Sequence, residues 1–189
     1  MKVVEIFESM QGEGRWMGIQ CVFVRFAGCN LKCPFCDEAS KYGNAVDMDV
    51  LQIVEGCGNV RHVVLTGGEP TLQPDFEKLI LSLQASGHYV HIETNGTNPI
   101  NNTGAWITCS PKGPLYEVKT RYDELKLVVD GSLTMYKAME LWEGKDPIWL
   151  QPCDGPDIEN SKSLIIQWIS KQPNAFRAGI QLHKYYEVI

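Results

Sequence analysis

The chain has 189 residues, of which 44% are hydrophobic and 21% are charged. These proportions are ordinary for a globular protein and exclude a disordered, collagen-like or coiled-coil chain. The formal net charge of −6 disfavours extended binding to nucleic acid or to an anionic membrane. At about 30 residues per βα unit, the chain can hold roughly six units, too few for a closed eightfold barrel of about 250 residues.

Short apolar runs bounded by glycine, proline, asparagine or aspartate predict strands, and apolar residues at helical spacing predict helices. In chain order we expect a strand at 21–26, a helix at 47–56, a strand at 62–65, a helix at 75–86, strands at 89–92, 106–109 and 124–129, a helix at 133–142, a strand at 148–150, a helix at 161–170 and a strand at 178–181. The segment 95–130 lacks helical periodicity, so a loop-rich crossover is expected there.

Strands that alternate with helices predict an α/β fold with a parallel sheet. The length favours a shortened, open (β/α) barrel of about six strands that forms a single domain over residues 1–189. Functional groups should then lie at the C-terminal ends of the strands. The N-terminal stretch has acidic residues and no long apolar run, so we expect no secretory signal, no membrane span and a cytoplasmic location.

Seven cysteines exclude a fully paired set of disulfides, because the number is odd. Cys29, Cys33 and Cys36 form a C-x3-C-x2-C loop directly after the first expected strand. Thiolates at this spacing can hold three irons of a [4Fe–4S] cluster and leave the fourth open to a ligand. A zinc site would need a fourth ligand, such as Asp37 or His183, and three unligated cysteines are a further alternative. The scattered cysteines have apolar neighbours and are expected in the core: Cys21, Cys57, Cys109 and Cys153.

Polar clusters follow four other expected strands, namely TGGEP at 66–70, ETNGT at 93–97, SPK at 110–112 and QPCD at 151–154. Each alone could be an ordinary turn, but together they indicate a site at one edge of the sheet. Before the first strand, Gln11 and Glu13 could hydrogen-bond the donor and acceptor edge of a ligand. Arg25 is a charge on an apolar strand, so it should have a partner, and its guanidinium suits a carboxylate.

These segments resemble the radical S-adenosylmethionine superfamily and, within it, the 7-carboxy-7-deazaguanine synthase family. The resemblance rests on ESMQGEG, FVRFAGCNLKCPFCD, TGGEP, ETNGT, SPK, DELK, LQP and QLHK, and runs in order from Glu8 to Lys184. It implies a carbon–nitrogen lyase that converts 6-carboxy-5,6,7,8-tetrahydropterin to 7-carboxy-7-deazaguanine in queuosine and 7-deazapurine biosynthesis. It also implies a [4Fe–4S] cluster, S-adenosylmethionine, Mg²⁺, a flavodoxin- or ferredoxin-type electron donor and a homodimer.

The resemblance implies roles for individual residues as well. The cluster ligands would be Cys29, Cys33 and Cys36. The substrate would be surrounded by Met10, Gln11, Gly12, Glu13, Arg25 and Thr66. S-adenosylmethionine would contact Phe35, Asp37, Gly68, Glu69, Ser110, Pro111, Lys112, Gln151 and Asp154. Reduction of the cluster would cleave the bound S-adenosylmethionine to a radical that removes hydrogen from C6 of the substrate.

One position departs from the family pattern. Members usually carry a hydroxyl residue two places after the last cluster cysteine, where it binds Mg²⁺, and this chain has Glu38 there. A carboxylate is a hard oxygen ligand and can bind Mg²⁺, so Glu38 is the candidate for this role. Two alternatives stay open: Mg²⁺ binds differently, with Ser40 as a substitute ligand, or it is not needed.

Two other classes of function stay open from the sequence. A radical enzyme that activates a partner protein would need an open face above the cluster, whereas Gln11, Glu13 and Arg25 favour a pocket for a small pterin. A zinc-binding module without catalytic activity would hold zinc and no iron.

Overall fold

The computed structural model describes residues 1–36, 39–101, 103–113 and 117–188. The strands of this part form one sheet in the order β3-β1-β2-β4-β5-β6-β7-β8-β9. In this spatial order, the strands β2, β4, β5, β6, β7, β8 and β9 pair in parallel. Strand β1 pairs antiparallel with β2, and β3 pairs antiparallel with β1. The predicted α/β class with a mostly parallel, open sheet is therefore confirmed. The sheet has nine strands rather than about six.

The strands are β1 (Lys2–Met10), β2 (Gln20–Phe26), β3 (Val46–Asp47), β4 (His62–Gly67), β5 (Tyr89–Thr94), β6 (Trp106–Cys109), β7 (Glu124–Val129), β8 (Ile148–Pro152) and β9 (Phe176–Ala178). The α-helices are α1 (Val50–Gly56), α2 (Phe76–Ala85), α3 (Met135–Glu140), α4 (Ile158–Lys171) and α5 (Leu182–Tyr185). Two short 3₁₀ helices are η1 (Ala39–Asn44) and η2 (Pro70–Leu72).

Three strands differ from the sequence prediction. Strand β3 was not expected, and it includes Asp47, the predicted start of a helix that begins only at Val50. The long strand β1 was not expected, because its side chains are mostly half-buried and its apolar alternation is weak. The last strand lies at Phe176–Ala178 and not at 178–181. The N–H of Gly179 still donates to the carbonyl of Leu150 at 2.8 Å, and the chain then turns toward α5. The segment between β5 and β7 contains only β6 among the described residues, as the loop-rich prediction implied.

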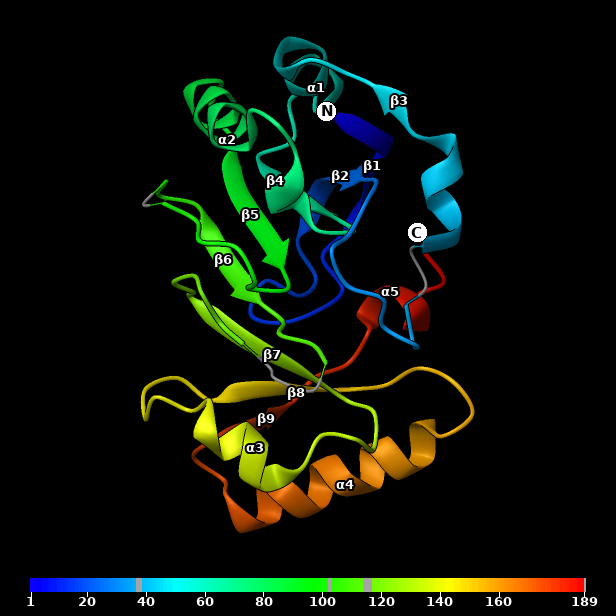
Figure 1. Cartoon of the computed structure of the whole chain (residues 1–189), viewed down its shortest axis with the longest axis vertical. Helices are drawn as coiled ribbons and strands as arrows, with labels where there is room; N and C mark the ends of the chain where they lie inside the picture. Colours follow the sequence, from blue (N-terminus) through cyan, green and yellow to red (C-terminus); the bar gives the residue numbers. More distant parts are fainter. Residues whose placement is uncertain (37–38, 102, 114–116, 189) are drawn as a thin grey trace.

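Two pairs of helices cover two different parts of the sheet. Figure 1 shows α1 and α2 together beside β4 and β5, and α3 and α4 together beside β7, β8 and β9. The apolar positions of each strand face these helices in two core clusters. Leu65 and Ile92 pack with Leu79 of α2, and Leu150 packs with Trp168 of α4. No helix in the described ranges is long and apolar enough to span a membrane.

The alternate positions of the same strands carry polar groups on the opposite face. Side chains in a strand alternate between faces, so residues two apart point the same way. Parallel register places Arg25 beside Thr66 and Glu93 beside Thr108. The loop at 11–19 lies against this face, where the Trp16 ring contacts the rings of His91 and Trp106. The fold therefore presents one polar face that the N-terminal loop partly covers.

Candidate functional site

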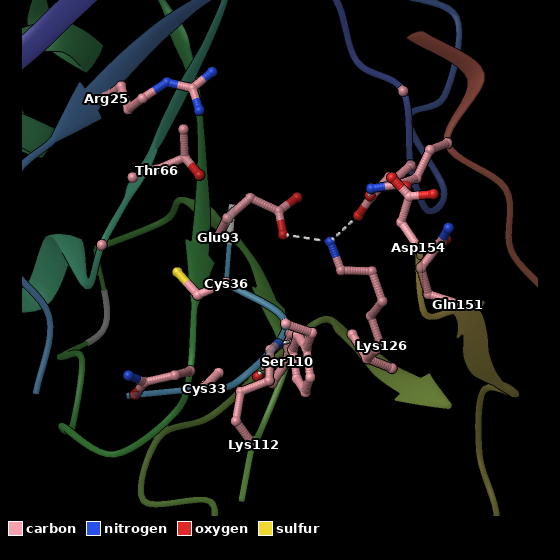
Figure 2. Close-up of a pocket in the computed structure, with 18 of the residues that line it drawn as sticks. Arg25, Cys33, Cys36, Thr66, Glu93, Ser110, Lys112, Lys126, Gln151 and Asp154 are labelled. Carbon is pink, nitrogen blue, oxygen red and sulfur yellow. Dashed lines mark hydrogen bonds and ion pairs between the residues drawn. The ribbon is translucent and has the colours of Figure 1, made fainter. Parts of the chain in front are cut away.

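A cavity of about 340 Å³ lies on this polar face of the sheet. Residues predicted for the site line it from the N-terminal loop, the cysteine loop and the ends of four strands (Figure 2). Those on the lining are Met10, Gln11, Gly12, Glu13, Arg25, Cys29, Cys33, Phe35, Cys36, Thr66, Gly68, Ser110, Lys112, Gln151 and Asp154. Glu69 and Pro111 do not line it, and Asp37 and Glu38 lie outside the described residues.

The cysteine loop is tied to the loop after β5. The side-chain nitrogen of Asn95 donates to Asn30 Oδ1 at 3.0 Å, and that of Asn30 donates to Thr97 Oγ1 at 2.8 Å. The thiols of Cys29, Cys33 and Cys36 are free and all reach the same cavity. The two loops therefore hold three thiols at one wall of the site.

This donor set fits a [4Fe–4S] cluster better than a single zinc ion. In the described part of the chain, no three Cys, His, Asp or Glu side chains are grouped around one metal position. A zinc ion needs its ligands to converge on one point, whereas each thiolate of a cluster binds a different iron. Three thiols that line one cavity, and that belong to no group around a single metal position among the described residues, match the second requirement.

The glycines of the TGGEP segment pack against the start of the cysteine loop. The N–H of Gly68 donates to Phe26 O, and the N–H of Glu69 donates to Gly28 O, both at 2.9 Å. A Cβ atom at residue 68 would overlap the carbonyl oxygen of Gly28. Because glycine has no Cβ, residue 68 admits the backbone of the neighbouring cysteine loop.

Glu69 is fully buried behind the cavity wall. Its carboxylate accepts hydrogen bonds from Thr94 Oγ1 and from the N–H of Asn95, both at 2.7 Å. It also accepts from Thr71 Oγ1 at 2.7 Å. These bonds join the loops after β4 and β5, and contact of Glu69 with S-adenosylmethionine stays a prediction.

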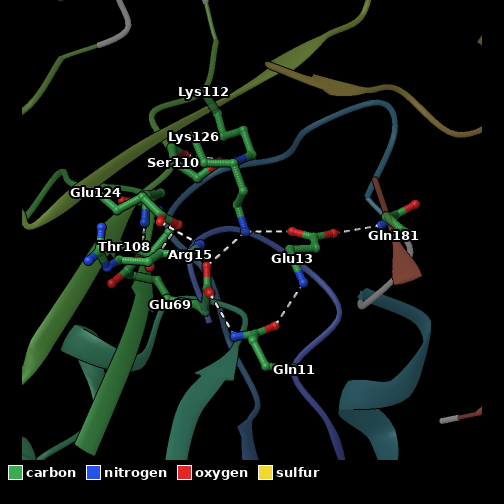
Figure 3. Close-up of polar contacts among 12 residues, drawn as sticks. Gln11, Glu13, Arg15, Glu69, Thr108, Ser110, Lys112, Glu124, Lys126 and Gln181 are labelled. Atoms are coloured by element: carbon green, nitrogen blue, oxygen red, sulfur yellow. Dashed lines mark hydrogen bonds and ion pairs between the residues drawn. The ribbon is translucent and has the colours of Figure 1, made fainter. Parts of the chain in front are cut away.

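A buried lysine that the sequence analysis did not single out lies at the centre of the cavity. Lys126 Nζ contacts Glu13 Oε2 at 2.5 Å (Figure 3) and Glu93 Oε2 at 2.9 Å (Figure 2). Burial opposes the charge of Lys126, but the two carboxylates raise its pKa well above the usual range. Burial also opposes the charge of Glu13 and by itself would raise its pKa, but the pairing with Lys126 lowers this pKa overall.

Hydrogen bonds from glutamine side chains complete a network around Lys126. Gln11 Nε2 donates to Glu93 Oε1 at 3.3 Å, and Gln11 Oε1 accepts from the N–H of Glu13 at 3.2 Å. Gln181 Nε2 donates to Glu13 Oε1 at 2.9 Å. Segments from both ends of the chain therefore meet β5 and β7 at this point.

Arg25 has the carboxylate partner that its apolar strand predicted. Its Nε lies 2.7 Å from Glu5 Oε1 on the neighbouring strand β1. The guanidinium also lies over the Phe7 ring, 5.2 Å from its centroid. The side chain lines the cavity as well, so these contacts fix the direction in which its charge points.

A second lysine lies beside Ser110. Lys112 Nζ donates to the Ser110 carbonyl at 2.7 Å and also contacts Ser110 Oγ (Figure 2). Burial, together with the charge of Lys126, lowers the pKa of Lys112 to about 8. Both lysines therefore bring positive charge to the cavity walls.

The end of β8 presents an amide without a hydrogen-bond partner. Gln151 is buried and lines the cavity, and neither its Oε1 nor its Nε2 bonds to any group in the described residues. An unpaired buried amide costs about 1–3 kcal/mol, so a bound polar ligand would stabilise it. Next to it, Cys153 is half-buried on the cavity lining, which corrects its assignment to the core. Cys21, Cys57 and Cys109 are buried as predicted.

Comparison with known protein families identifies the class of enzyme to which this fold and site belong. The sequence model described as "Radical SAM superfamily" matches residues 23–124, more than half of the chain. The matched range contains the cysteine loop and the loops after β4, β5 and β6. The parallel sheet and its three-cysteine loop are thus those of a radical S-adenosylmethionine enzyme.

Full-length relatives narrow the class. A 7-carboxy-7-deazaguanine synthase from Bacteroides thetaiotaomicron is 39% identical over 189 residues, which cover 99% of this chain and 98% of the relative. One from Bradyrhizobium diazoefficiens is 38% identical over 206 residues, covering 96% of each chain. The crystal structure of QueE from Escherichia coli superposes with a TM-score of 0.73 at 25% identity, covering 96% of this chain and 94% of that one. The chain belongs to the 7-carboxy-7-deazaguanine synthase family.

Proposed function

We propose that this chain converts 6-carboxy-5,6,7,8-tetrahydropterin to 7-carboxy-7-deazaguanine with release of ammonia, a step in 7-deazapurine and queuosine biosynthesis. The family supports this reaction class. One structural observation carries the proposal for this chain: three cluster-type thiols and the Glu13–Lys126–Glu93 group share one cavity. The protein binds and orients the substrate and the cofactors, and it keeps water out of the site.

Most of the residues that would hold the cofactors line the cavity; Glu69 and Pro111 do not line it, and Asp37 lies outside the described residues. When bound, a [4Fe–4S] cluster and S-adenosylmethionine supply one-electron, hydrogen-abstracting chemistry. Cys29, Cys33 and Cys36 would ligate the cluster. S-adenosylmethionine would contact Phe35, Asp37, Gly68, Glu69, Ser110, Pro111, Lys112, Gln151 and Asp154. The unpaired amide of Gln151 supports this assignment most directly, because it needs a polar ligand.

The substrate would occupy the side with the carboxylates. The pyrimidine ring of a pterin carries N–H donors along one edge, and the carboxylates of Glu13 and Glu93 can accept them. Arg25 would bind the substrate carboxylate, for which its fork of N–H donors is suited. Met10, Gln11, Gly12 and Thr66 would complete the enclosure.

Mg²⁺, the electron donor and the assembly belong to this proposal as well. Glu38 would supply a hard oxygen ligand for Mg²⁺. A flavodoxin- or ferredoxin-type protein would reduce the cluster. We further propose a single radical S-adenosylmethionine domain over residues 1–189 that works as a cytoplasmic homodimer. Replacing Glu38 with alanine should weaken the dependence of activity on Mg²⁺, and an unchanged dependence would contradict the ligand role.

The substrate assignment is tested by product analysis. The anaerobically reconstituted enzyme is incubated with the carboxytetrahydropterin, S-adenosylmethionine and a reductant, and the products are identified by mass spectrometry. We expect 7-carboxy-7-deazaguanine from the native chain and none from Cys33→Ala. A fully clustered enzyme that cleaves S-adenosylmethionine but leaves the pterin unchanged would refute the substrate. A purified chain that holds zinc and no iron would refute the radical reaction.

A further inference from the structure

A single buried ammonium joins two carboxylates in the part of the cavity assigned to the substrate. Lys126 Nζ bonds to Glu13 from the N-terminal loop and to Glu93 from β5. The exposed fraction of the Lys126 side chain is only 9%, so solvent screens this charge little. Because one positive charge faces two negative ones, the group keeps one net negative charge.

Each carboxylate keeps a second hydrogen bond that fixes its orientation. The other oxygen of Glu13 accepts from Gln181, and the other oxygen of Glu93 accepts from Gln11. A carboxylate has about four lone-pair sites, so each group retains capacity to accept further N–H donors. The network thus presents oriented acceptors and leaves part of their capacity for a ligand.

We propose that Lys126 is a positioning residue for the substrate: its ammonium holds the carboxylates of Glu13 and Glu93 in the orientation that accepts the N–H edge of the pterin. The inference rests on the proposed function. Without the ammonium, two carboxylates that bonded to the same nitrogen would face each other in a buried site. Like charges so placed favour uptake of a proton by one of them, and the protonated oxygen becomes a donor. The site would then lose an acceptor at the position where the substrate presents a donor.

Other charged side chains lie near Lys126 and the two carboxylates and affect whether a carboxylate takes up a proton. Glu124 lies on β7 two residues before Lys126, Lys112 follows β6, and His183 on α5 lies near Glu13. Lys112 is directed to Ser110 and does not bond to either carboxylate in the described residues. The ammonium of Lys126 contacts the carboxylates of both Glu13 and Glu93, so the role falls to Lys126.

The test compares Lys126→Met, which removes the charge at similar length, with Lys126→Arg, which keeps it. Lys137→Met is the matched control, because Lys137 forms an exposed pair with Glu140 on α3. Holoenzyme with its cluster is titrated with the pterin and, separately, with S-adenosylmethionine. We expect Lys126→Met to weaken pterin binding by about 100-fold, the effect of removing one partner of a buried ion pair. Binding of S-adenosylmethionine and the iron content should stay unchanged, and Lys126→Arg should recover part of the pterin affinity.

A readout without substrate separates this inference from the proposed function. Infrared difference spectra of Lys126→Met should show the C=O stretch of a protonated carboxyl at neutral pH, and Glu13→Gln in the same background should remove it or shift it. The absence of that band, or equal loss of pterin and S-adenosylmethionine binding, would overturn the role of Lys126. A native holoenzyme that does not bind the pterin would instead overturn the proposed function, and with it the substrate part of this inference.

Discussion

The N–H of Leu182 donates to the carbonyl oxygen of Gly12 at 2.8 Å, which joins the last helix to the loop after the first strand. This bond brings Gln181 next to Glu13, although the two residues are 168 positions apart. The two ends of the chain therefore build one wall of the cavity together. A change at this junction should affect the substrate side of the site more than the cluster side.

Replacing Gly12 with alanine tests this junction. A Cβ atom at residue 12 would overlap the His183 ring and lie 3.0 Å from the His183 backbone nitrogen, so α5 would have to move. We expect the KM for the pterin to rise by about tenfold or more, because small displacements of a binding wall are costly. Cleavage of S-adenosylmethionine without pterin should change little. Gly43→Ala is the control, because no atom lies within 4 Å of a Cβ at that position.

Replacing Gly68 with alanine should damage the cluster side instead. The added methyl group would overlap the Gly28 carbonyl oxygen and push the cysteine loop away from the strand β4. A complete cluster holds about four irons per chain. After reconstitution of Gly68→Ala, we expect iron and sulfide analysis to find clearly fewer. Full cluster content in Gly68→Ala would show that the contact between these two loops does not position the thiols.

Replacing Gln151 with methionine probes the unpaired amide. Since the amide has no partner in the described residues, its removal should raise the free energy of unfolding of the S-adenosylmethionine-free protein by about 1 kcal/mol. Stabilisation by added S-adenosylmethionine should shrink, as seen in the shift of Tm. Gln84→Met is the matched contrast: Gln84 Nε2 donates to Thr103 O at 2.8 Å, so that variant should lose stability. Equal losses in both variants would argue against a ligand at Gln151.

Replacing Glu124 with glutamine should change how stability depends on pH. Burial raises the pKa of Glu124 from 4.5 to about 7, although the N–H of Arg15 bonds to its carboxylate at 2.7 Å. The folded chain therefore keeps a proton that the unfolded chain releases, and the contribution of Glu124 to stability falls as the pH rises from 4.5 to 7. Glu124→Gln should gain about 2 kcal/mol over the native chain at pH 8 and lose this advantage near pH 5. Denaturant unfolding at both pH values measures the gap, and an equal gap at both would contradict a protonated Glu124.

The site could be predicted from the sequence where its residues follow strands or, like Arg25, carry a lone charge in an apolar strand, but Lys126 inside β7 was missed. The cysteine loop and the segments TGGEP, SPK and QPCD follow apolar runs, and all of them contribute residues to the cavity. Lys126 lies inside β7, where every position after Glu124 is otherwise apolar, and its alternation with Leu125 and Leu127 was the available signal. That alternation shows which face Lys126 occupies, but its partner Glu13 is 113 positions away.

The sequence prediction also failed for strand β1 and for the burial of Cys153. The half-buried residues of β1 lack a clear two-residue period, so their strand depends on pairing with β2. Cys153 follows an apolar strand and was therefore assigned to the core, but it lies beyond the point where β8 leaves the sheet interior. In both places tertiary contacts decide the structure, and local composition does not report them.

The central claim is that one cavity brings S-adenosylmethionine and the pterin together on this chain. Its most direct test uses carboxytetrahydropterin with deuterium at C6, the reconstituted native enzyme and a reductant, with mass spectrometry of both products. The account predicts that 7-carboxy-7-deazaguanine forms and that deuterium appears in the adenosyl group, recovered as S-adenosylmethionine or as 5′-deoxyadenosine. Deoxyadenosine that stays free of deuterium, with the pterin recovered unchanged, would contradict it.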